Sequence, residues 1–177
     1  MRIIITGTPG TGKSQVAREL SKGLSLELID LKKVVHRNHL LGARHEVDIK
    51  KLARALVAEL KGKKGYVIEG HLACEMKLPA DYIFILRSSP EALQRRFKKR
   101  RYPGKKIEEN IEAELLDYCA ERVSAVYGRG VRALEIDTSK RTVKGSCDEI
   151  QRAIRLKKKK CDTVTYSLID YLGLIRR

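Results

Sequence analysis

The sequence lacks the features that mark several classes of protein. It contains no tryptophan, and aromatic residues make up only 5% of its 177 positions. Its longest apolar runs, of about five residues, are far shorter than a membrane-spanning helix requires. No apolar segment at the start of the chain resembles a secretion signal. We therefore expect a soluble intracellular protein, with the cytoplasm as the default location and the nucleus as the alternative for a eukaryotic source.

Cysteines are also too few and too scattered for a metal or disulfide framework. They form no Cys-x-x-Cys pair, and no His-x3-His spacing accompanies them. Such pairs are the usual sequence signature of a structural zinc site. The four cysteines are Cys74, Cys119, Cys147 and Cys161.

Negative charge is in short supply as well. The chain carries 38 Lys and Arg against 22 Asp and Glu, a net charge of +16. Residues 87–106 contain nine basic residues and one acidic residue, and residues 139–177 contain eleven basic and four acidic residues. A surface of one sign attracts ligands of the other sign. The composition therefore excludes an acidic disordered chain and favours an anionic partner.

Short apolar runs alternate with helical patterns along the chain. Strands are predicted at 3–5, 26–29, 66–68, 82–86 and 131–136. Helices are predicted at 15–22, 33–40, 49–61, 91–100, 107–126, 147–156 and 164–172. This alternation is typical of a parallel sheet covered on both faces. We expect an α/β fold: a three-layer P-loop nucleoside-triphosphate-binding domain whose five-stranded parallel sheet has helices on both faces.

A run of lysines at 157–160 marks the expected end of the compact domain. We expect a P-loop kinase domain over residues 1–156. Residues 157–177 would form a basic C-terminal extension with a short helix.

Residues 7–14 read GTPGTGKS and fit the pattern GxxxxGK[ST], between a predicted strand and a predicted helix. The glycines let successive backbone amides point at phosphate oxygens, and the helix N-terminus adds partial positive charge. Lys13 would bridge the β- and γ-phosphates, and the Ser14 hydroxyl would ligate Mg²⁺. The motif predicts binding of a nucleoside triphosphate without separating kinases from ATPases. No Asn-Lys-x-Asp motif for guanine is present.

Glu69 and His71 follow the predicted strand 66–68. Glu69 is placed to hold a metal-bound water, and His71 to orient an attacking water or a phosphate. The alternatives are a surface carboxylate at a strand end and an ordinary loop histidine.

Four arginines lie near the end of the basic helix, ahead of a Pro-Gly loop at 103–104: Arg95, Arg96, Arg100 and Arg101. Phosphoryl transfer needs cations around the transferring group, because charge accumulates on its oxygens. A helix, short loop and helix with several arginines fits a lid over residues 99–109. The alternative is a solvated basic face.

Several motifs together carry a resemblance to a known family. The chain reads GTPGTGK at 7–13, EGH at 69–71, ILR at 85–87 and RRY at 100–102, followed by Lys105, Lys106, Glu109, Asn110 and Glu114. This arrangement resembles the adenylate kinase isoenzyme six family over residues 1–137. The resemblance implies an ATP-dependent nucleoside monophosphate kinase with ATPase activity that also acts in ribosome biogenesis and rRNA processing. It further implies small-subunit ribosomal protein eleven and pre-ribosomal RNA as partners, and no membrane.

The resemblance also assigns site residues. It implies ATP contacts at Gly10, Gly12, Lys13, Ser14 and Gln15, and a nucleotide-contacting lid arginine at Arg100. The monophosphate-binding segment would span residues 30–53, with Arg37 and Arg44 as candidate ligands of the acceptor phosphate.

The chain departs from the family pattern at three positions. Glu69 stands where Asp is frequent, Gln15 where Thr is frequent, and Arg101 where the lid usually has glycine. The last departure leaves the lid arginine open between Arg100 and Arg101.

Three functions remain as alternatives: a monophosphate kinase, an ATPase-type ribosome assembly switch with little kinase activity, and a small-metabolite kinase of the shikimate or gluconate type. The preferred acceptor (AMP, CMP or dAMP) and the oligomeric state also stay open.

Overall fold

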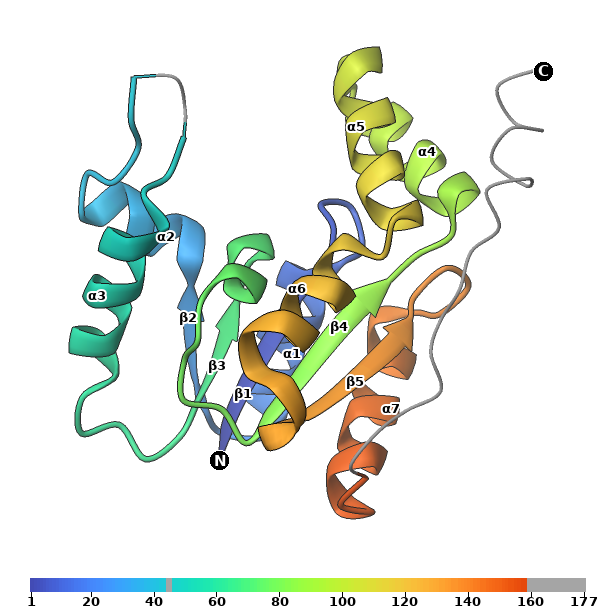
Figure 1. Cartoon of the computed structure of the whole chain (residues 1–177). Coiled ribbons are helices and arrows are strands. Elements are labelled where there is room, and N and C mark those ends of the chain that lie inside the picture. The colour runs from blue at the N-terminus through green and yellow to red at the C-terminus, as the bar shows by residue number, and fades with distance from the viewer. Residues whose placement is uncertain (44–45, 159–177) are drawn as a thin grey trace.

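The computed structural model describes residues 1–43 and 46–158 and contains one parallel sheet (Figure 1). The strand order is β2-β3-β1-β4-β5. All four strand pairs are parallel. The strands are β1 (Arg2–Thr6), β2 (Glu27–Asp30), β3 (Tyr66–Glu69), β4 (Tyr82–Arg87) and β5 (Arg132–Asp137). The predicted five-stranded parallel sheet is confirmed.

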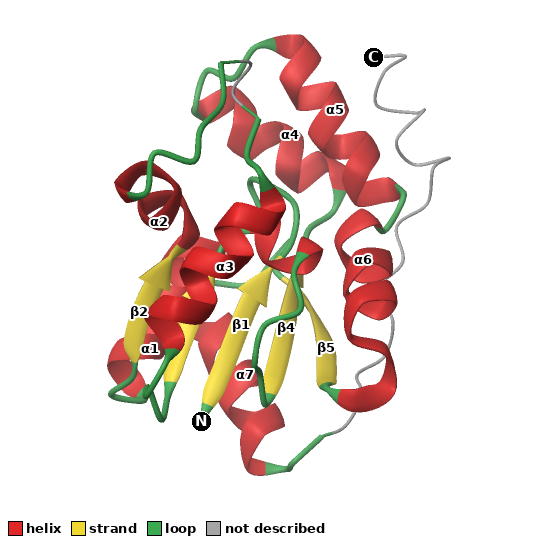
Figure 2. Cartoon of the chain, turned by 60° about the vertical axis from the view of Figure 1, so that its left-hand side comes forward, coloured by secondary structure: helices red, strands yellow, loops and turns green. Residues whose placement is uncertain are grey.

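Helices cover both faces of this sheet (Figure 2). They are α1 (Lys13–Gly23), α2 (Leu31–Arg37), α3 (Ile49–Leu60), α4 (Pro90–Lys99), α5 (Gly104–Leu115), α6 (Tyr118–Tyr127) and α7 (Val143–Arg155), with 3-10 helices η1 (His71–Glu75) and η2 (Gly128–Gly130). Helices α1 and α7 pack on one face, while α2, α3, η1 and α6 pack on the other. Helices α4 and α5 form a hairpin with its own small core.

The strand β1 shows why the sheet is buried on both sides. Its three isoleucines are fully buried, although alternate residues of a strand point to opposite faces. Ile3 and Ile5 join the core under α1 and α7, and Ile4 joins the core under α2, α3 and α6. An uninterrupted apolar run is therefore required here, as in parallel sheets generally.

One predicted helix is wrong. The stretch 107–126 is not continuous but consists of α5 and α6, separated at Leu116 and Asp117. Asp117 takes a left-handed backbone conformation, with φ of 53°, and its carboxylate pairs with the buried Arg87. The ion pair and the turn redirect the chain, which helical periodicity alone does not reveal. The predicted helix 164–172 lies outside the described residues.

Helix starts are set by residues that accept hydrogen bonds from the first turn. The side chain of Asp30 accepts from the backbone of Lys32 at 2.9 Å, so α2 begins at Leu31, before the predicted start. Thr142 accepts from the backbone of Gly145 at 3.0 Å, so α7 begins at Val143.

Within residues 1–43 and 46–158, no helix has the length and apolar character needed to cross a bilayer.

Candidate active site

The loop after β1 lies at the carboxyl end of the central strand, where ligands bind in open α/β sheets. Glycine is required at its first position, because a Cβ on Gly7 would lie 2.3 Å from the Leu86 carbonyl oxygen. Gly12 has φ of 95° and caps the N-terminus of α1. The loop therefore brings a left-handed turn and a helix N-terminus to one point, the arrangement that binds phosphate.

Lys13 is almost fully buried, with 8% of its surface exposed. Its Nζ donates to the Thr8 carbonyl at 2.8 Å, and Thr11 Oγ1 donates to the same oxygen at 2.9 Å. Burial lowers the pKa of Lys13. The ammonium is thus held inside the loop against an oxygen acceptor, where a phosphate oxygen would be a stronger partner.

Ser14, in the first turn of α1, contacts Glu69 at the end of β3. Strand β3 pairs with β1 so that Glu69 lies beside Ile5. Ser14 Oγ donates to Glu69 Oε1 at 3.0 Å, and the carboxylate is 6% exposed. Burial raises the pKa of Glu69. A hydroxyl and a carboxylate in contact beside a phosphate loop are the hard oxygen donors that Mg²⁺ prefers, so these two residues fit a magnesium ion.

His71 begins η1, two residues beyond Glu69, and part of its surface remains exposed. Desolvation by the surrounding protein lowers its pKa to about 4, and the Lys13 cation adds to this shift. His71 is therefore neutral at neutral pH. Its backbone carbonyl accepts from Thr6 Oγ1 at 3.3 Å and from Cys74 Sγ at 3.1 Å.

Polar contacts and a pair of cysteines hold the 3-10 helix that carries His71 against α6. Glu75 accepts from Tyr118 at 2.5 Å and pairs with Arg122 at 2.9 Å. The buried thiols of Cys74 and Cys119 lie 3.9 Å apart between the two elements. The position of His71 consequently depends on α6, which directly follows the α4–α5 hairpin.

A polar pocket of about 440 Å³ opens beside the loop. The loop, α1, α4, the β5–α7 connection and the start of α7 line it, with these residues: Gly10, Thr11, Gly12, Gln15, Val16, Arg96, Lys99, Arg100, Thr138, Arg141, Val143 and Ser146. The structure thus brings four predicted site residues together here: Gly10, Gly12, Gln15 and Arg100. Arg101 is not among the lining residues and takes a left-handed conformation with φ of 55°.

Four further polar residues belong to this region. Arg96 belongs to α4, and Ser88 directly follows β4. Thr138 and Arg141 lie in the segment after β5. Arg96 was visible only as one of several arginines in a basic helix. Thr138 and Arg141 belong to no motif, and only the pairing of β5 with β4 brings them near the loop.

The predicted acceptor segment 30–53 offers fewer residues that could form a phosphate site than the phosphate loop does. Arg37 pairs with Glu59 of α3 at 2.5 Å, and its side chain is 62% exposed. Arg44 lies outside the described residues.

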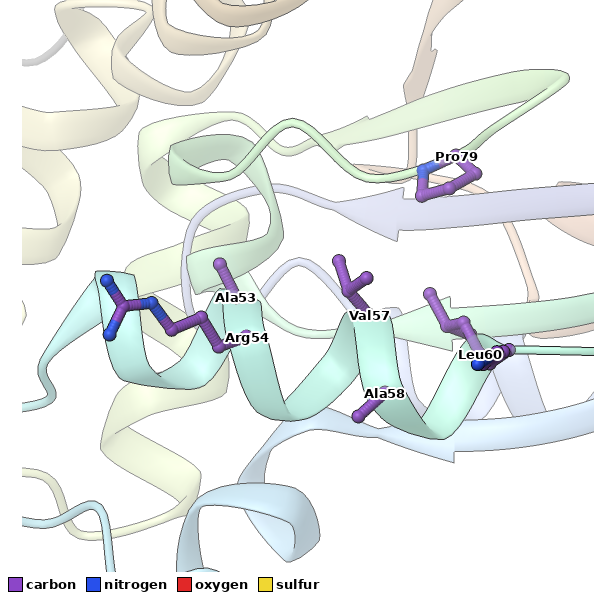
Figure 3. A pocket seen from close by; sticks show the side chains of 7 residues that line it. Ala53, Arg54, Val57, Ala58, Leu60 and Pro79 are labelled. Atoms are coloured by element: carbon purple, nitrogen blue, oxygen red, sulfur yellow. The ribbon is translucent and has the colours of Figure 1, made fainter.

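A second, mainly apolar pocket of about 620 Å³ lies along α3 near Pro79 (Figure 3). Pro79 precedes β4 and Leu60 precedes β3, so this pocket is near the amino ends of the strands, opposite the phosphate loop.

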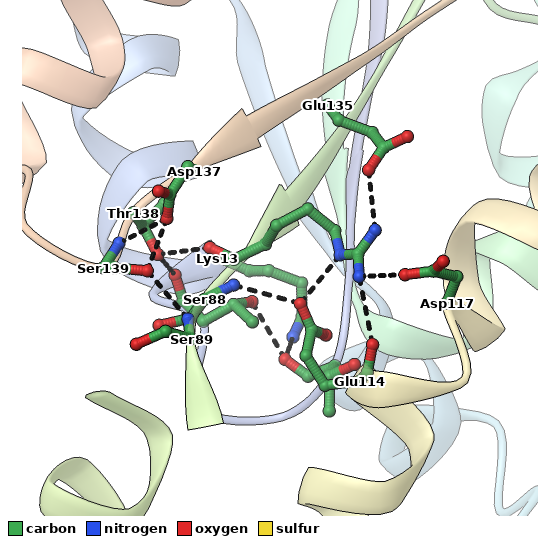
Figure 4. A network of polar contacts seen from close by, with 12 residues as sticks. Lys13, Ser88, Ser89, Glu114, Asp117, Glu135, Asp137, Thr138 and Ser139 are labelled. Carbon is green, nitrogen blue, oxygen red and sulfur yellow. Dashed lines mark hydrogen bonds and ion pairs between the residues drawn. The ribbon is translucent and has the colours of Figure 1, made fainter. Parts of the chain in front are cut away.

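Arg87, at the end of β4, is 1% exposed and joins the sheet to the hairpin. Figure 4 labels its three acidic partners, Glu114, Asp117 and Glu135. Its guanidinium pairs with Glu114 at 2.8 Å, with Glu135 at 2.6 Å and with Asp117. Burial opposes the charge, but the carboxylates of Glu114 and Asp117 outweigh this effect and raise the pKa of Arg87. Glu114 also accepts from the backbone of Ser88 at 3.0 Å.

Solved kinase structures share this fold. A shikimate kinase from Acinetobacter baumannii in complex with shikimate superposes with a TM-score of 0.65 at 18% identity, covering 89% of this chain and 94% of that one. A deoxyadenosine kinase from M. mycoides with bound dATP gives a TM-score of 0.58 at 19% identity, covering 88% and 100%. At this identity the likeness concerns the fold alone.

Similarity in sequence identifies the family as well as the fold. A family model described as an AAA domain matches residues 3–117. A protein of Methanocaldococcus jannaschii named "Putative adenylate kinase" is 37% identical over 183 residues, covering 98% of each chain. A protein of the same name from Pyrococcus furiosus is 36% identical over 157 residues, covering 87% of this chain and 84% of the relative. With its intact phosphate loop, this chain is a kinase-like P-loop enzyme and belongs to the adenylate kinase-like family.

Proposed function

We propose that the protein is a nucleoside monophosphate kinase that transfers the γ-phosphoryl group of ATP to AMP or a related monophosphate. The observation that carries this proposal is the buried Lys13 inside the phosphate loop, next to the Ser14–Glu69 contact. The polar pocket beside the loop is the proposed place for the rest of the donor nucleotide. Residues 1–156 form the proposed kinase domain.

Each residue has a proposed task in the transfer. Lys13 stabilises the β,γ-bridging oxygen and the γ-phosphate oxygens as charge develops on them. Ser14, directly, and Glu69, through a water, would hold Mg²⁺, which would neutralise charge on the transferring phosphates. Gly10, Gly12 and Gln15 contact the nucleotide. Arg100, with Arg101 as the alternative, closes over it with the lid at 99–109.

In the transfer itself, an oxygen of the acceptor phosphate forms a bond to the γ-phosphorus. The bond between that phosphorus and the bridging oxygen breaks, and the electron pair stays on the departing diphosphate. The acceptor binds along residues 30–53, so that its phosphate meets the donor at the loop. Closure of the lid excludes water, which would otherwise compete as the acceptor.

A coupled assay with AMP, CMP, dAMP or no acceptor tests this proposal. We expect acceptor-dependent formation of ADP. Turnover that is independent of every acceptor supports the ATPase switch instead. The absence of turnover in all four of these assays, together with phosphorylation of a small hydroxylated metabolite, supports the metabolite kinase.

His71 has a proposed role in hydrolysis rather than in transfer. A neutral imidazole can orient a water, whereas transfer uses the acceptor's own oxygen as nucleophile. The variant His71→Gly should lose ATPase activity disproportionately. An equal loss of both activities, or of neither, contradicts this role.

A second proposed function is ribosome biogenesis with rRNA processing, in the cytoplasm or, for a eukaryotic source, the nucleus. The partners would be small-subunit ribosomal protein eleven and pre-ribosomal RNA. Seven exposed cations on the α4–α5 hairpin favour an anionic partner: Arg95, Lys98, Lys99, Arg100, Arg101, Lys105 and Lys106. The basic extension 157–177, beyond the proposed domain boundary, adds to this charge.

Binding to a small-subunit rRNA fragment over a salt series tests this second function. Affinity should fall steeply with salt, and each phosphate-contacting cation removed should flatten the logarithmic slope by about one unit or less. The full chain is compared with a chain ending at Leu156 and with Lys98→Ala/Lys105→Ala. Equal slopes for all three would remove the RNA role of both basic regions.

A further inference from the structure

Arg96 makes several polar contacts beside the phosphate loop. Its Nη1 donates to the Gly10 carbonyl at 3.1 Å and to Ser88 Oγ at 3.0 Å, and lies 3.3 Å from Thr138 Oγ1. Its Nη2 donates to the Thr138 carbonyl at 2.6 Å. One side chain of α4 therefore touches the segments that follow β1, β4 and β5.

The contact with Gly10 bears directly on phosphate binding. A phosphate loop works by pointing backbone N–H groups at the ligand, so its carbonyl oxygens must point away. Gly10 has φ of 90°, and glycine allows the adjoining peptide group to rotate more freely than other residues do. Arg96 donates to the Gly10 carbonyl and so holds this oxygen toward α4.

Apolar packing places α4 where this donor is needed. A Cβ on Gly10 would lie 2.8 Å from Phe97 Cζ and 3.0 Å from Leu93 Cδ2. Both side chains are fully buried. The helix thus closes against the outer side of the loop, with Arg96 as the polar part of the contact.

The same guanidinium connects the loop to the lid. Arg100 lies one helical turn beyond Arg96, and both line the polar pocket. The Thr138 hydroxyl lies 2.9 Å from the Thr11 carbonyl and 2.8 Å from the Arg87 carbonyl. Arg96 and Arg100 therefore line the same pocket, while Arg96 contacts the loop directly at Gly10 and indirectly, through Thr138, at Thr11.

We propose that Arg96 is a positioning residue that orients the Gly10 carbonyl outward and so prepares the loop for the triphosphate of ATP. It acts through the loop backbone rather than on the nucleotide base. This role rests on the proposed use of the loop for ATP. A lysine cannot replace Arg96, because a single terminal nitrogen cannot serve Gly10 and Thr138 as a planar fork does.

The test measures the dissociation constants of MgATP and of magnesium tripolyphosphate, which has the phosphates without the base. In Arg96→Lys, both ligands should bind about tenfold more weakly or worse, and by the same factor. The matched control Arg95→Lys changes the exposed neighbour on the same helix and should bind both ligands as the parent chain does. Circular dichroism at the assay temperature verifies that each variant is folded.

Three outcomes overturn the inference: parental affinity in Arg96→Lys, a loss for MgATP with tripolyphosphate binding retained, or a parent chain that binds neither ligand. The second outcome would mean that Arg96 contacts the base. Failure of the proposed function is distinguishable, because a parent chain that binds both ligands but phosphorylates no monophosphate removes the kinase activity only. The binding comparison then still decides the role of Arg96.

Discussion

Two groups of cations share residues 87–106 but occupy opposite environments. Arg87 and Arg96 lie at the base of the hairpin, where carboxylates or carbonyls of four other segments surround their guanidinium groups. The seven cations from Arg95 to Lys106 are exposed. Charge therefore has two uses within residues 87–106. Arg87 and Arg96, at the base, hold the sheet, loop and hairpin together. The seven exposed cations, called the tip below, present charge to solvent and ligands.

The difference teaches that burial, and not the number of arginines, separates structural from ligand-facing charge. A buried cation without partners is strongly unfavourable, so each buried guanidinium here is matched by oxygens. An exposed cation has no such requirement, because water solvates it. Variants at the base should therefore affect folding or loop geometry. Variants at the tip should affect nucleotide binding only where the side chain lines the pocket, as Arg100 does.

The largest effect is expected for Arg87→Met, which leaves the buried carboxylate of Glu114 without its cation. Removing one partner of a buried ion pair typically costs about 3–5 kcal/mol of unfolding free energy. Urea denaturation measures this loss. The control Arg2→Met breaks a half-exposed pair with Asp81 and should cost about 1 kcal/mol or less. Similar losses in both variants would contradict the distinction between buried and exposed charge.

Lys13→Met should lower turnover by roughly a hundredfold or more while the fold persists. The change removes a desolvated charge directed at the transferring phosphoryl group. Steady-state kinetics of the purified variant provides the measurement. Lys22→Met, an exposed lysine on the same helix, should keep parental turnover. A Lys13→Met protein that is as active as its parent would overturn the phosphate-loop assignment.

Arg100→Ala should lower kcat/KM for ATP by about tenfold, since the side chain lines the pocket beside the loop. Arg101→Ala, its neighbour outside the lining, should stay within about twofold of the parent. Kinetics at varied ATP separates the two. Full activity in the double variant would show that the tip is only a solvated connection.

The smallest effect is expected for Arg101→Gly. Arg101 has φ of 55°, a conformation that costs a non-glycine residue about 1–2 kcal/mol, and the flexibility of glycine in the unfolded chain offsets part of the gain. We expect a net stabilisation of about 0.5 kcal/mol in urea denaturation. Arg101→Ala retains a Cβ and should show no gain. A destabilised Arg101→Gly would mean that the arginine side chain itself supports the hairpin.

Sequence patterns predicted the sheet and the phosphate loop well, because buried parallel strands and a Gly-rich loop both have strong local signatures. The proximity of Glu69 to Ser14 also followed, since a strand end next to β1 had to supply the acid. The break at Asp117 was missed because it depends on Arg87, 30 residues earlier in the chain. Arg96 could not be told from Arg95, since only the packed structure shows which one faces the loop.

The position of β1 at the centre of the sheet has a consequence for biosynthesis. Of the five strands of the sheet this one is synthesised first, yet its two neighbours, β3 and β4, follow only after α1, β2, α2 and α3 have been synthesised. Until they emerge, three consecutive isoleucines and the phosphate loop have no sheet to join. Thr138, which contacts Arg96, arrives later still. A ribosome-bound nascent chain should therefore bind no nucleotide until nearly the whole domain has left the exit tunnel. The isoleucine run of β1 is where a chaperone would be needed first.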